Sequence, residues 1–312
     1  MEISILLAEQ ILAMFLTMAV GFGVVRAGLF KTEDSRIISN MVVYICNPCV
    51  VVHSFQIELT DDKIKGLMIA IGLSVVVHMV LIIGSEILSF IFHFNSIEKA
   101  SIIYTNAGYL VIPLVGAVLG EEWVFYTTAF ILVQTVLMWT HGVKLIGQEK
   151  ELNIRKILCN PNVIAMIIGI ALFALEIRLP TVVDSCVSGF GDMISPASMM
   201  VSGMVIGDVD LKWVFRQKRP YLICLLRLIV FPLIAVVAFA GLERSGIHPD
   251  AEYILMIVLI ATSAPAAAMI TQLAQIYGKD SRYASVINVM SVIFCIITMP
   301  VMVLSYEMLI AL

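Results

Sequence analysis

The sequence predicts an all-α integral membrane protein whose ten transmembrane helices form two halves of five. Three observations predict this fold class. Of the 312 residues 61% are apolar and only 13% are charged, whereas an ordinary soluble domain carries about 25% charged residues. The mean hydropathy is +1.02, which leaves too little polar surface to cover a soluble domain. The apolar residues also form long runs without the strict alternation of membrane-spanning strands.

Ten apolar runs are long enough to be membrane spans, because a helix needs roughly 20 apolar residues to cross a bilayer. Lipid accepts only helices or closed barrels, and charged or turn residues separate the runs. We number them segments 1 to 10, at residues 4–26, 35–56, 66–94, 99–119, 123–147, 161–177, 181–207, 219–241, 252–276 and 281–310.

The joints between segments predict the orientation. Fourteen of the nineteen Lys and Arg lie in joints 1–2, 3–4, 5–6, 7–8 and 9–10 or at the segment ends beside them. Because cytoplasmic joints carry the excess of Lys and Arg, we expect these joints in the cytoplasm of a multi-pass cell-membrane protein and both termini outside. The formal net charge of −4 argues against a nucleic-acid partner.

Two halves of five segments predict an inverted repeat, because an odd number of spans turns the second copy upside down. The first repeat covers residues 1–147, a short cytoplasmic linker covers 148–160, and the second repeat covers 161–312. Pro48 and Pro196, which we expect to break their helices, occupy matching positions in segments 2 and 7. Pro48 follows Ser35 by thirteen residues, and Pro196 follows Val183 by thirteen.

Segments 4 and 9 each contain a proline about halfway along, Pro113 and Pro265, among small and polar residues. Proline removes a backbone donor and clashes with the preceding turn, and open backbone inside a bilayer must be satisfied by protein or a water-filled cavity. A broken helix gains a new N-terminus with a positive dipole end. Two such ends predict an anion site; the alternative is that both prolines are packing kinks.

Several motifs in order resemble the auxin efflux carrier family of ten-span transporters. The residues that carry the resemblance are Asn40, Pro48 and His53 in segment 2, Asn106 with Pro113 and Leu114 in segment 4, Gln134 and Trp139 in segment 5, and Pro265, Tyr277 and Pro300 near the end. The resemblance covers nearly the whole chain. The family includes plant auxin exporters and bacterial permeases for malate or malonate.

The resemblance implies a fold like that of the sodium/proton antiporters, with scaffold and transport subdomains each drawn from both repeats. It implies that segments 4 and 9 cross at their breaks, that Asn106 and Gln134 face the substrate, and that the transport subdomain moves like an elevator. Joint 5–6 is too short for the long cytoplasmic insert of the plant members.

Further candidates for the substrate site are Ser263, Asn47 and Tyr109. Candidate groups for ion or proton coupling are His53, His78, Glu86 and Arg227, because ionisable groups within spans are expensive and usually functional. The alternatives are structural histidines, and side chains that extend to the interface; an ion pair between Glu86 and Arg227 is left open.

The sequence therefore predicts a secondary transporter of a small organic anion, with a carboxylate favoured. We expect no enzyme activity, because no nucleophile–base or metal-ligand set is visible. We expect no cofactor and no metal, and coupling to Na⁺, H⁺ or the substrate gradient is left open, as is a homodimer. The alternative function is a membrane receptor that binds a ligand without moving it.

Overall fold

A computed structural model of the chain describes residues 2–147, 158–207 and 209–311. Six helical stretches in this part are long and apolar enough to cross a membrane: Glu9–Arg26, Thr32–Ser54, Asp61–Phe92, Glu121–Gly147, Arg219–Glu243 and Ser281–Ile310. They confirm six of the predicted spans as long apolar helices. The other four segments contain shorter helices, so the ten-span arrangement stays a prediction.

The helices follow one another along the chain as the predicted segments do. Segment 1 is α1 (Glu2–Arg26), and segment 2 contains α2 (Ser35–Met41) and α3 (Asn47–Ser54). Segment 3 is α4 (Asp61–Phe92), segment 4 contains α5 (Ser96–Ile103) and α6 (Ile112–Val118), and segment 5 contains α7 (Val124–Leu137) and α8 (Val143–Gly147).

In the second half, segment 6 is α10 (Pro161–Ala174) and segment 7 contains α11 (Thr181–Asp192) and α12 (Ile194–Gly207). A short α13 (Leu211–Arg216) leads to segment 8, which contains α14 (Arg219–Leu225) and α15 (Phe231–Glu243). Segment 9 contains α16 (Ala251–Ser263) and α17 (Met269–Ile276), and segment 10 is α18 (Ser281–Ile310). Most of the predicted linker, residues 148–157, lies outside the described residues.

The prolines break fewer helices than the sequence predicts. Pro48, Pro113 and Pro232 each stand two residues after a π-helical turn, Val42–Cys46, Ala107–Val111 and Leu226–Val230 respectively. A π-turn widens the helix and shifts its hydrogen bonds by one residue, so that the helix continues past the proline that would otherwise clash. Segment 2 is therefore continuous at Pro48, contrary to the predicted break.

The interruption of segment 4 also differs in position from the prediction. It lies at residues 104–106, upstream of Pro113, which occupies the first turn of α6. Segment 9 is interrupted at residues 264–268, which include Pro265. In segment 7 the change of helix comes at Met193, and Pro196 lies in the first turn of α12.

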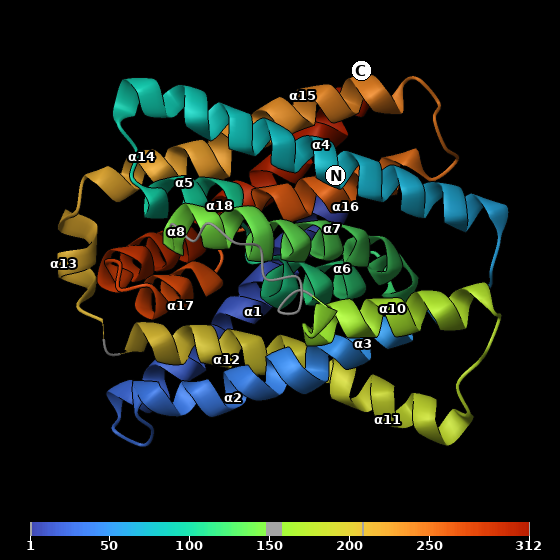
Figure 1. Cartoon of the computed structure of the whole chain (residues 1–312), viewed down its shortest axis with the longest axis horizontal. Helices are drawn as coiled ribbons and strands as arrows, with labels where there is room; N and C mark the ends of the chain where they lie inside the picture. Colours follow the sequence, from blue (N-terminus) through green and yellow to red (C-terminus); the bar gives the residue numbers. More distant parts are fainter. Residues whose placement is uncertain (1, 148–157, 208, 312) are drawn as a thin grey trace.

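The helices pack into two groups that run side by side. In the first group α1 and α2 pack on α12, and α3 packs on α10 and α11. Figure 1 shows α2, α3, α10, α11 and α12 along the lower side of the molecule and α4 and α15 along the upper side. The second group contains the packed pairs α4 with α7, α15 with α16 and α17 with α18.

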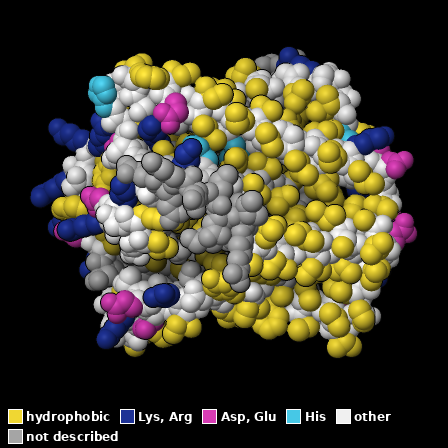
Figure 2. Space-filling view, viewed as in Figure 1, with side chains coloured by type: hydrophobic (Ala, Val, Ile, Leu, Met, Phe, Trp, Pro, Cys, Tyr) yellow, Lys and Arg dark blue, Asp and Glu magenta, His cyan; other side chains and the backbone are white. Residues whose placement is uncertain are grey.

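The polarity of α4 is the reverse of that of a helix on a soluble protein. Its buried stripe carries small and polar side chains, among them Gly66, Ser74 and His78, while Met68 and Phe90 are 63% and 83% exposed. A bilayer favours apolar side chains on the lipid-facing surface of a helix and small side chains where helices pack closely together. Figure 2 shows the same distribution, with hydrophobic side chains across the middle of the face and charged ones toward its ends. The protein is therefore a multi-pass membrane protein.

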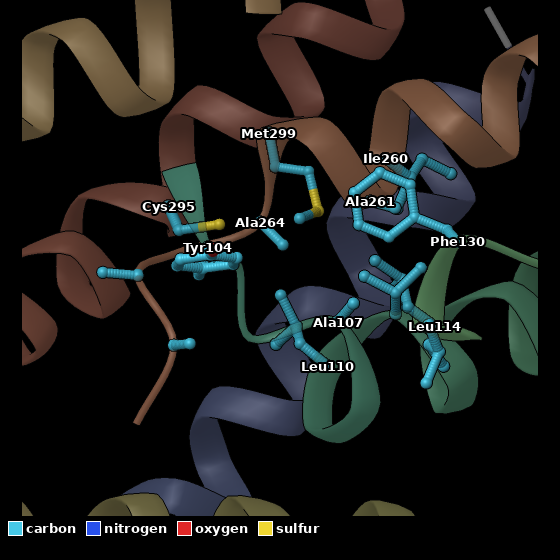
Figure 3. Packing of buried hydrophobic residues seen from close by; sticks show 14 of the residues in the cluster. Tyr104, Ala107, Leu110, Leu114, Phe130, Ile260, Ala261, Ala264, Cys295 and Met299 are labelled. Carbon is cyan, nitrogen blue, oxygen red and sulfur yellow. The ribbon is translucent and has the colours of Figure 1, made fainter. Parts of the chain in front are cut away.

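The centre of the second group is α16. Every residue from Ile254 to Ser263 is at most 1% exposed, as expected for a helix that is apolar on all sides. Figure 3 shows side chains from segments 4, 5, 9 and 10, such as Tyr104, Phe130 and Cys295, packed around the end of this helix. The interruption of segment 9 thus lies in the interior, where its backbone groups need partners from the protein.

Candidate functional site

The two interrupted segments meet at their interruptions. Residues 104–106 separate the two helical parts of segment 4, and residues 264–268 separate α16 from α17. An isolated antiparallel bridge pairs Thr105 with Ala266. We call residues 104–106 and 264–268 the paired breaks.

Two backbone hydrogen bonds form this bridge. The N–H of Asn106 donates to the carbonyl of Pro265 at 2.8 Å, and the N–H of Ala267 donates to the carbonyl of Tyr104 at 3.0 Å. The two bonds are reciprocal, since each segment donates one N–H to the other and accepts one in return. They satisfy four backbone groups that a continuous helix would have satisfied within itself.

The side chain of Gln134, on α7, satisfies the backbone of Thr105. Its Oε1 accepts the N–H of Thr105 at 2.8 Å and the hydroxyl at 3.0 Å, and its Nε2 donates to the carbonyl of Thr105 at 2.8 Å. Both ends of the amide are therefore used within the protein. The family resemblance implies that Gln134 faces the substrate, whereas in the structure its amide bonds the segment 4 break.

Two side chains of α18 do the same for Ala266 in the other half. The N–H of Ala266 donates to Oγ of Ser291 at 3.1 Å, and Nδ2 of Asn288 donates to the carbonyl of Ala266 at 2.7 Å. Each break is thus held by polar side chains from the segment that follows it. Sequence reasoning missed Asn288 and Ser291. They could have been noticed as polar residues within the apolar segment 10.

A narrow cavity lies at the paired breaks, between the two groups of helices. Its volume is about 10 Å³, about the size of one water molecule. It is lined by residues from segments 1, 4, 7, 9 and 10: Ile11, Phe15, Asn106, Leu110, Met199, Ser202, Pro265, Val292 and Cys295. Of the predicted site residues, the structure brings Asn106 and Pro265 together here.

The helix ends around the breaks give the cavity its electrostatic character. The helical stretch Ala107–Val118 begins directly after Asn106, and α17 begins at Met269. The first N–H groups of a helix lack partners within it and carry the positive end of its dipole. Two positive helix ends therefore start at the paired breaks, an arrangement that favours an anion.

Three other predicted substrate residues lie near the breaks but do not line the cavity. Ser263 is fully buried and its Oγ has no hydrogen-bond partner among the described residues. The amide of Asn47 stands beside Gly108, with its Oδ1 buried and also unpaired in the described part of the chain. The hydroxyl of Tyr109 lies 3.2 Å from that of Ser39 on α2.

The structure separates Glu86 from Arg227. Glu86 is exposed and its carboxylate pairs with Lys99 at 2.8 Å. Arg227 is fully buried and donates to the carbonyl of Ile102 at 3.3 Å. Glu86 and Arg227, whose pairing the sequence left open, therefore do not pair in the structure. Arg227, in the π-helical turn Leu226–Val230, is buried and does not extend to the interface.

The two candidate histidines have different surroundings. His78 is fully buried on α4, where its Nδ1 lies 2.7 Å from the carbonyl of Ser74 and its ring lies against Phe130. His53, on α3, is partly exposed, and its Nδ1 lies 2.9 Å from Oδ1 of Asp184 on α11. Sequence reasoning missed Asp184, which the fold brings to His53 from 131 residues away.

A buried carboxylate outside the predicted spans joins three segments. Glu98, only 1% exposed, accepts two hydrogen bonds from Arg219 and one from Tyr283. Burial raises the pKa of Glu98, but Arg219, the N–H of Asn95 and Tyr283 together hold this pKa below its ordinary value. The signal that sequence reasoning missed is the capping box of Asn95 and Glu98 at the start of α5.

Within the described residues no cluster of three or more His, Cys, Asp or Glu is placed to hold a metal ion. Among known families, a profile described as membrane transport protein matches residues 6–154 and 149–303. The two matches together cover nearly the whole chain and meet at the predicted linker. No protein among those with curated descriptions matches the chain.

Proposed function

The chain belongs to the membrane transport protein family, the family of the auxin efflux carriers, and on that premise we propose that it is a secondary transporter of a small organic anion. The family makes it a membrane transporter with a small-molecule substrate. The anion, its binding at the paired breaks and the mode of movement are the parts that we propose.

The observation that carries the proposal is the meeting of two helix starts at the cavity that Asn106 and Pro265 line. Backbone N–H groups and two positive dipole ends bind a carboxylate without needing a charged side chain in the lining. The amide of Asn106, 7% exposed at the cavity, supplies a further donor. In this proposal Gln134, Asn288 and Ser291 hold the breaks in the shape that binds.

The packing supports elevator-type movement. The cavity lies between the group that contains α1 and α12, which we propose as the scaffold, and the group that carries both breaks, which we propose as the transport subdomain. At about 10 Å³ the cavity is too small for a carboxylate, so a relative movement of the two groups must open it. Such movement would carry the breaks and their anion together.

The matched support of the breaks favours an inverted repeat of segments 1–5 and 6–10. Thr105 is held by a side chain of segment 5 and Ala266 by side chains of segment 10. Figure 2 shows Lys and Arg gathered at one end, where Figure 1 places α13 and α14. This end fits a cytoplasmic face, with both termini outside.

The experiment that tests the proposal is counterflow in proteoliposomes. A thermal-shift screen with dicarboxylates, indole acids and amino acids, with and without Na⁺, first selects the anion, because a ligand of the native state raises its apparent stability. We expect exchange of that anion by the wild type and none by Asn106→Ala. Asn40→Ala, at an exposed position on α2, is the matched control.

The outcomes separate the alternatives. Exchange by Asn106→Ala at the wild-type rate would remove Asn106 and the cavity from the proposal. Binding of the anion without exchange by the wild type would indicate a receptor in place of a transporter. A requirement for Na⁺ or for a proton gradient would identify the coupling ion, with His53, His78 and Glu86 as the groups to test next.

A further inference from the structure

The guanidinium of Arg227 is a buried positive charge with two unused donors. Its side chain is 0% exposed, and Nη1 donates to the carbonyl of Ile102. Its Nε and Nη2 have no hydrogen-bond partner among the described residues. An arginine keeps its charge in proteins, and a buried charge without a counter-charge is strongly unfavourable. A bound anion would supply the counter-charge that the guanidinium lacks.

The two acidic residues that most closely precede Ile102 in the sequence already have cationic partners. Glu86 pairs with Lys99, and Glu98 pairs with Arg219. The carbonyl of Ile102, at the C-terminal end of α5, supplies only the partial negative charge of a helix end. The positive charge of Arg227 is therefore only partly balanced within the described chain.

The unused edge of Arg227 has the shape that binds a carboxylate. Nε and Nη2 lie on the same edge of the planar guanidinium and donate in parallel. The chain itself shows this use at Arg219, whose Nε and Nη2 donate to the two carboxylate oxygens of Glu98 at 2.6 and 3.1 Å. In Arg227 the same two atoms are free of protein partners in the described part of the chain.

Arg227 also lies next to the candidate site. Ile102, which it contacts, stands four residues before Asn106. Cys295 lines the cavity and also lies near Arg227. In Figure 3 Cys295 lies where segment 10 converges with Tyr104 and Ala264 of the two breaks. Cys295 is thus a neighbour of both the cavity and Arg227.

We propose that Arg227 is the fixed counter-charge of the transported anion, and that its Nε and Nη2 bind one carboxylate of the substrate when the cavity opens past Cys295. The inference rests on the proposed function and adds to it a charged side chain that binds the carboxylate of the substrate. It also gives the site a full positive charge in addition to the helix ends, so that the uncharged amide of the same acid should bind poorly.

The test compares acids with their amides. Purified protein is titrated by thermal shift with acetate, malonate, succinate and indole-3-acetate, each beside its uncharged amide. We expect the wild type to prefer at least one acid over its amide by about tenfold or more, since a charge-assisted bidentate pair is lost with the amide. Arg227→Met should remove most of this preference and leave only the part due to the helix ends. Arg227→Lys, which keeps the charge without the planar edge, should retain more of it.

Arg244→Met is the matched control. Arg244 also donates to a carbonyl, that of Leu309 at 2.8 Å, but at an exposed position, so its removal should leave the preference unchanged. An acid preference that Arg227→Met or Arg227→Lys retains in full overturns the inference, and Arg227→Lys alone decides if Arg227→Met does not fold. If the acid binds both Arg227 variants as it binds the wild type but fails to bind Asn106→Ala, the proposed function stands without Arg227. If no acid stabilises the wild type, both proposals fall.

Discussion

The side-chain amide of Gln134 bonds both backbone groups of Thr105, its Oε1 accepting the N–H and its Nε2 donating to the carbonyl, each at 2.8 Å. Thr105 is 1% exposed and lies between two helical stretches. Its backbone would otherwise be unsatisfied inside the membrane, where each such group is costly. Gln134 thus supplies the two backbone hydrogen bonds that a neighbouring strand would supply in a sheet.

Replacing Gln134 by leucine should destabilise the protein strongly. The change leaves a buried N–H and a buried carbonyl of Thr105 without partners, which we expect to lower the free energy of unfolding by about 2–4 kcal/mol. The midpoint of thermal unfolding in detergent measures the effect.

Gln275→Leu, at an exposed position on α17, is the control and should change the midpoint little. Equal midpoints for Gln134→Leu and the wild type would show that Gln134 does not support the break. In that case its amide would be free to face the substrate, as the sequence predicts.

The pH dependence of stability should carry the signature of Glu98. Because its pKa is held below its ordinary value of 4.5 in the folded state, the unfolded chain binds its proton first. The stabilisation is present above about pH 4.5 and is lost as the pH falls through the lower folded pKa. We therefore expect wild-type stability to fall as the pH is lowered below about 4.5.

In Glu98→Gln this part of the acid-induced loss should be missing, although the variant starts less stable at neutral pH because Arg219 loses its counter-charge. Glu86→Gln, at an exposed carboxylate paired with Lys99, should keep the wild-type profile. Identical acid profiles for Glu98→Gln and the wild type would contradict the role of Glu98.

The contact between α1 and α12 should tolerate no side chain at Gly203. A Cβ there would clash with the carbonyl oxygen of Met18, so Gly203→Ala must push the two helices apart. We expect a loss of about 1–3 kcal/mol in the free energy of unfolding, measured as a lower thermal midpoint.

Gly23→Ala provides the contrast on the same pair of helices, because nothing lies within 4 Å of a Cβ at Gly23. This change should be neutral or should stabilise by up to about 1 kcal/mol through helix propensity. If both variants behaved alike, close packing at Gly203 would not hold the proposed scaffold together.

The sequence predicted six of the segments as long apolar helices correctly, because long apolar runs are a direct consequence of lipid as solvent. It located the break of segment 4 at Pro113, although the interruption lies at residues 104–106. A proline restricts the backbone, but whether the helix stops or widens into a π-turn depends on which neighbours can bond the freed groups.

The supports of the breaks were harder to predict. Asn288 and Ser291 are polar residues in an apolar run, and their spacing does not say which backbone they bond. The burial of Arg227 depends likewise on tertiary packing, since the same residue near the end of a span commonly extends to the interface. Polar contacts between distant segments are the part of the site that one sequence carries least information about.

The most direct test of the account is a disulfide between the two breaks. Thr105 and Ala266 are an antiparallel pair without hydrogen bonds to each other, and such pairs have Cα atoms about 4.5 Å apart, within the range that a disulfide needs. In a cysteine-free background with a protease site in the joint between segments 5 and 6, Thr105→Cys with Ala266→Cys should keep the two fragments together after mild oxidation and cleavage. Thr105→Cys with Thr271→Cys, five residues further along, should release them. Separate fragments for the first pair in the folded protein would contradict the meeting of the breaks, and with it the site proposed there.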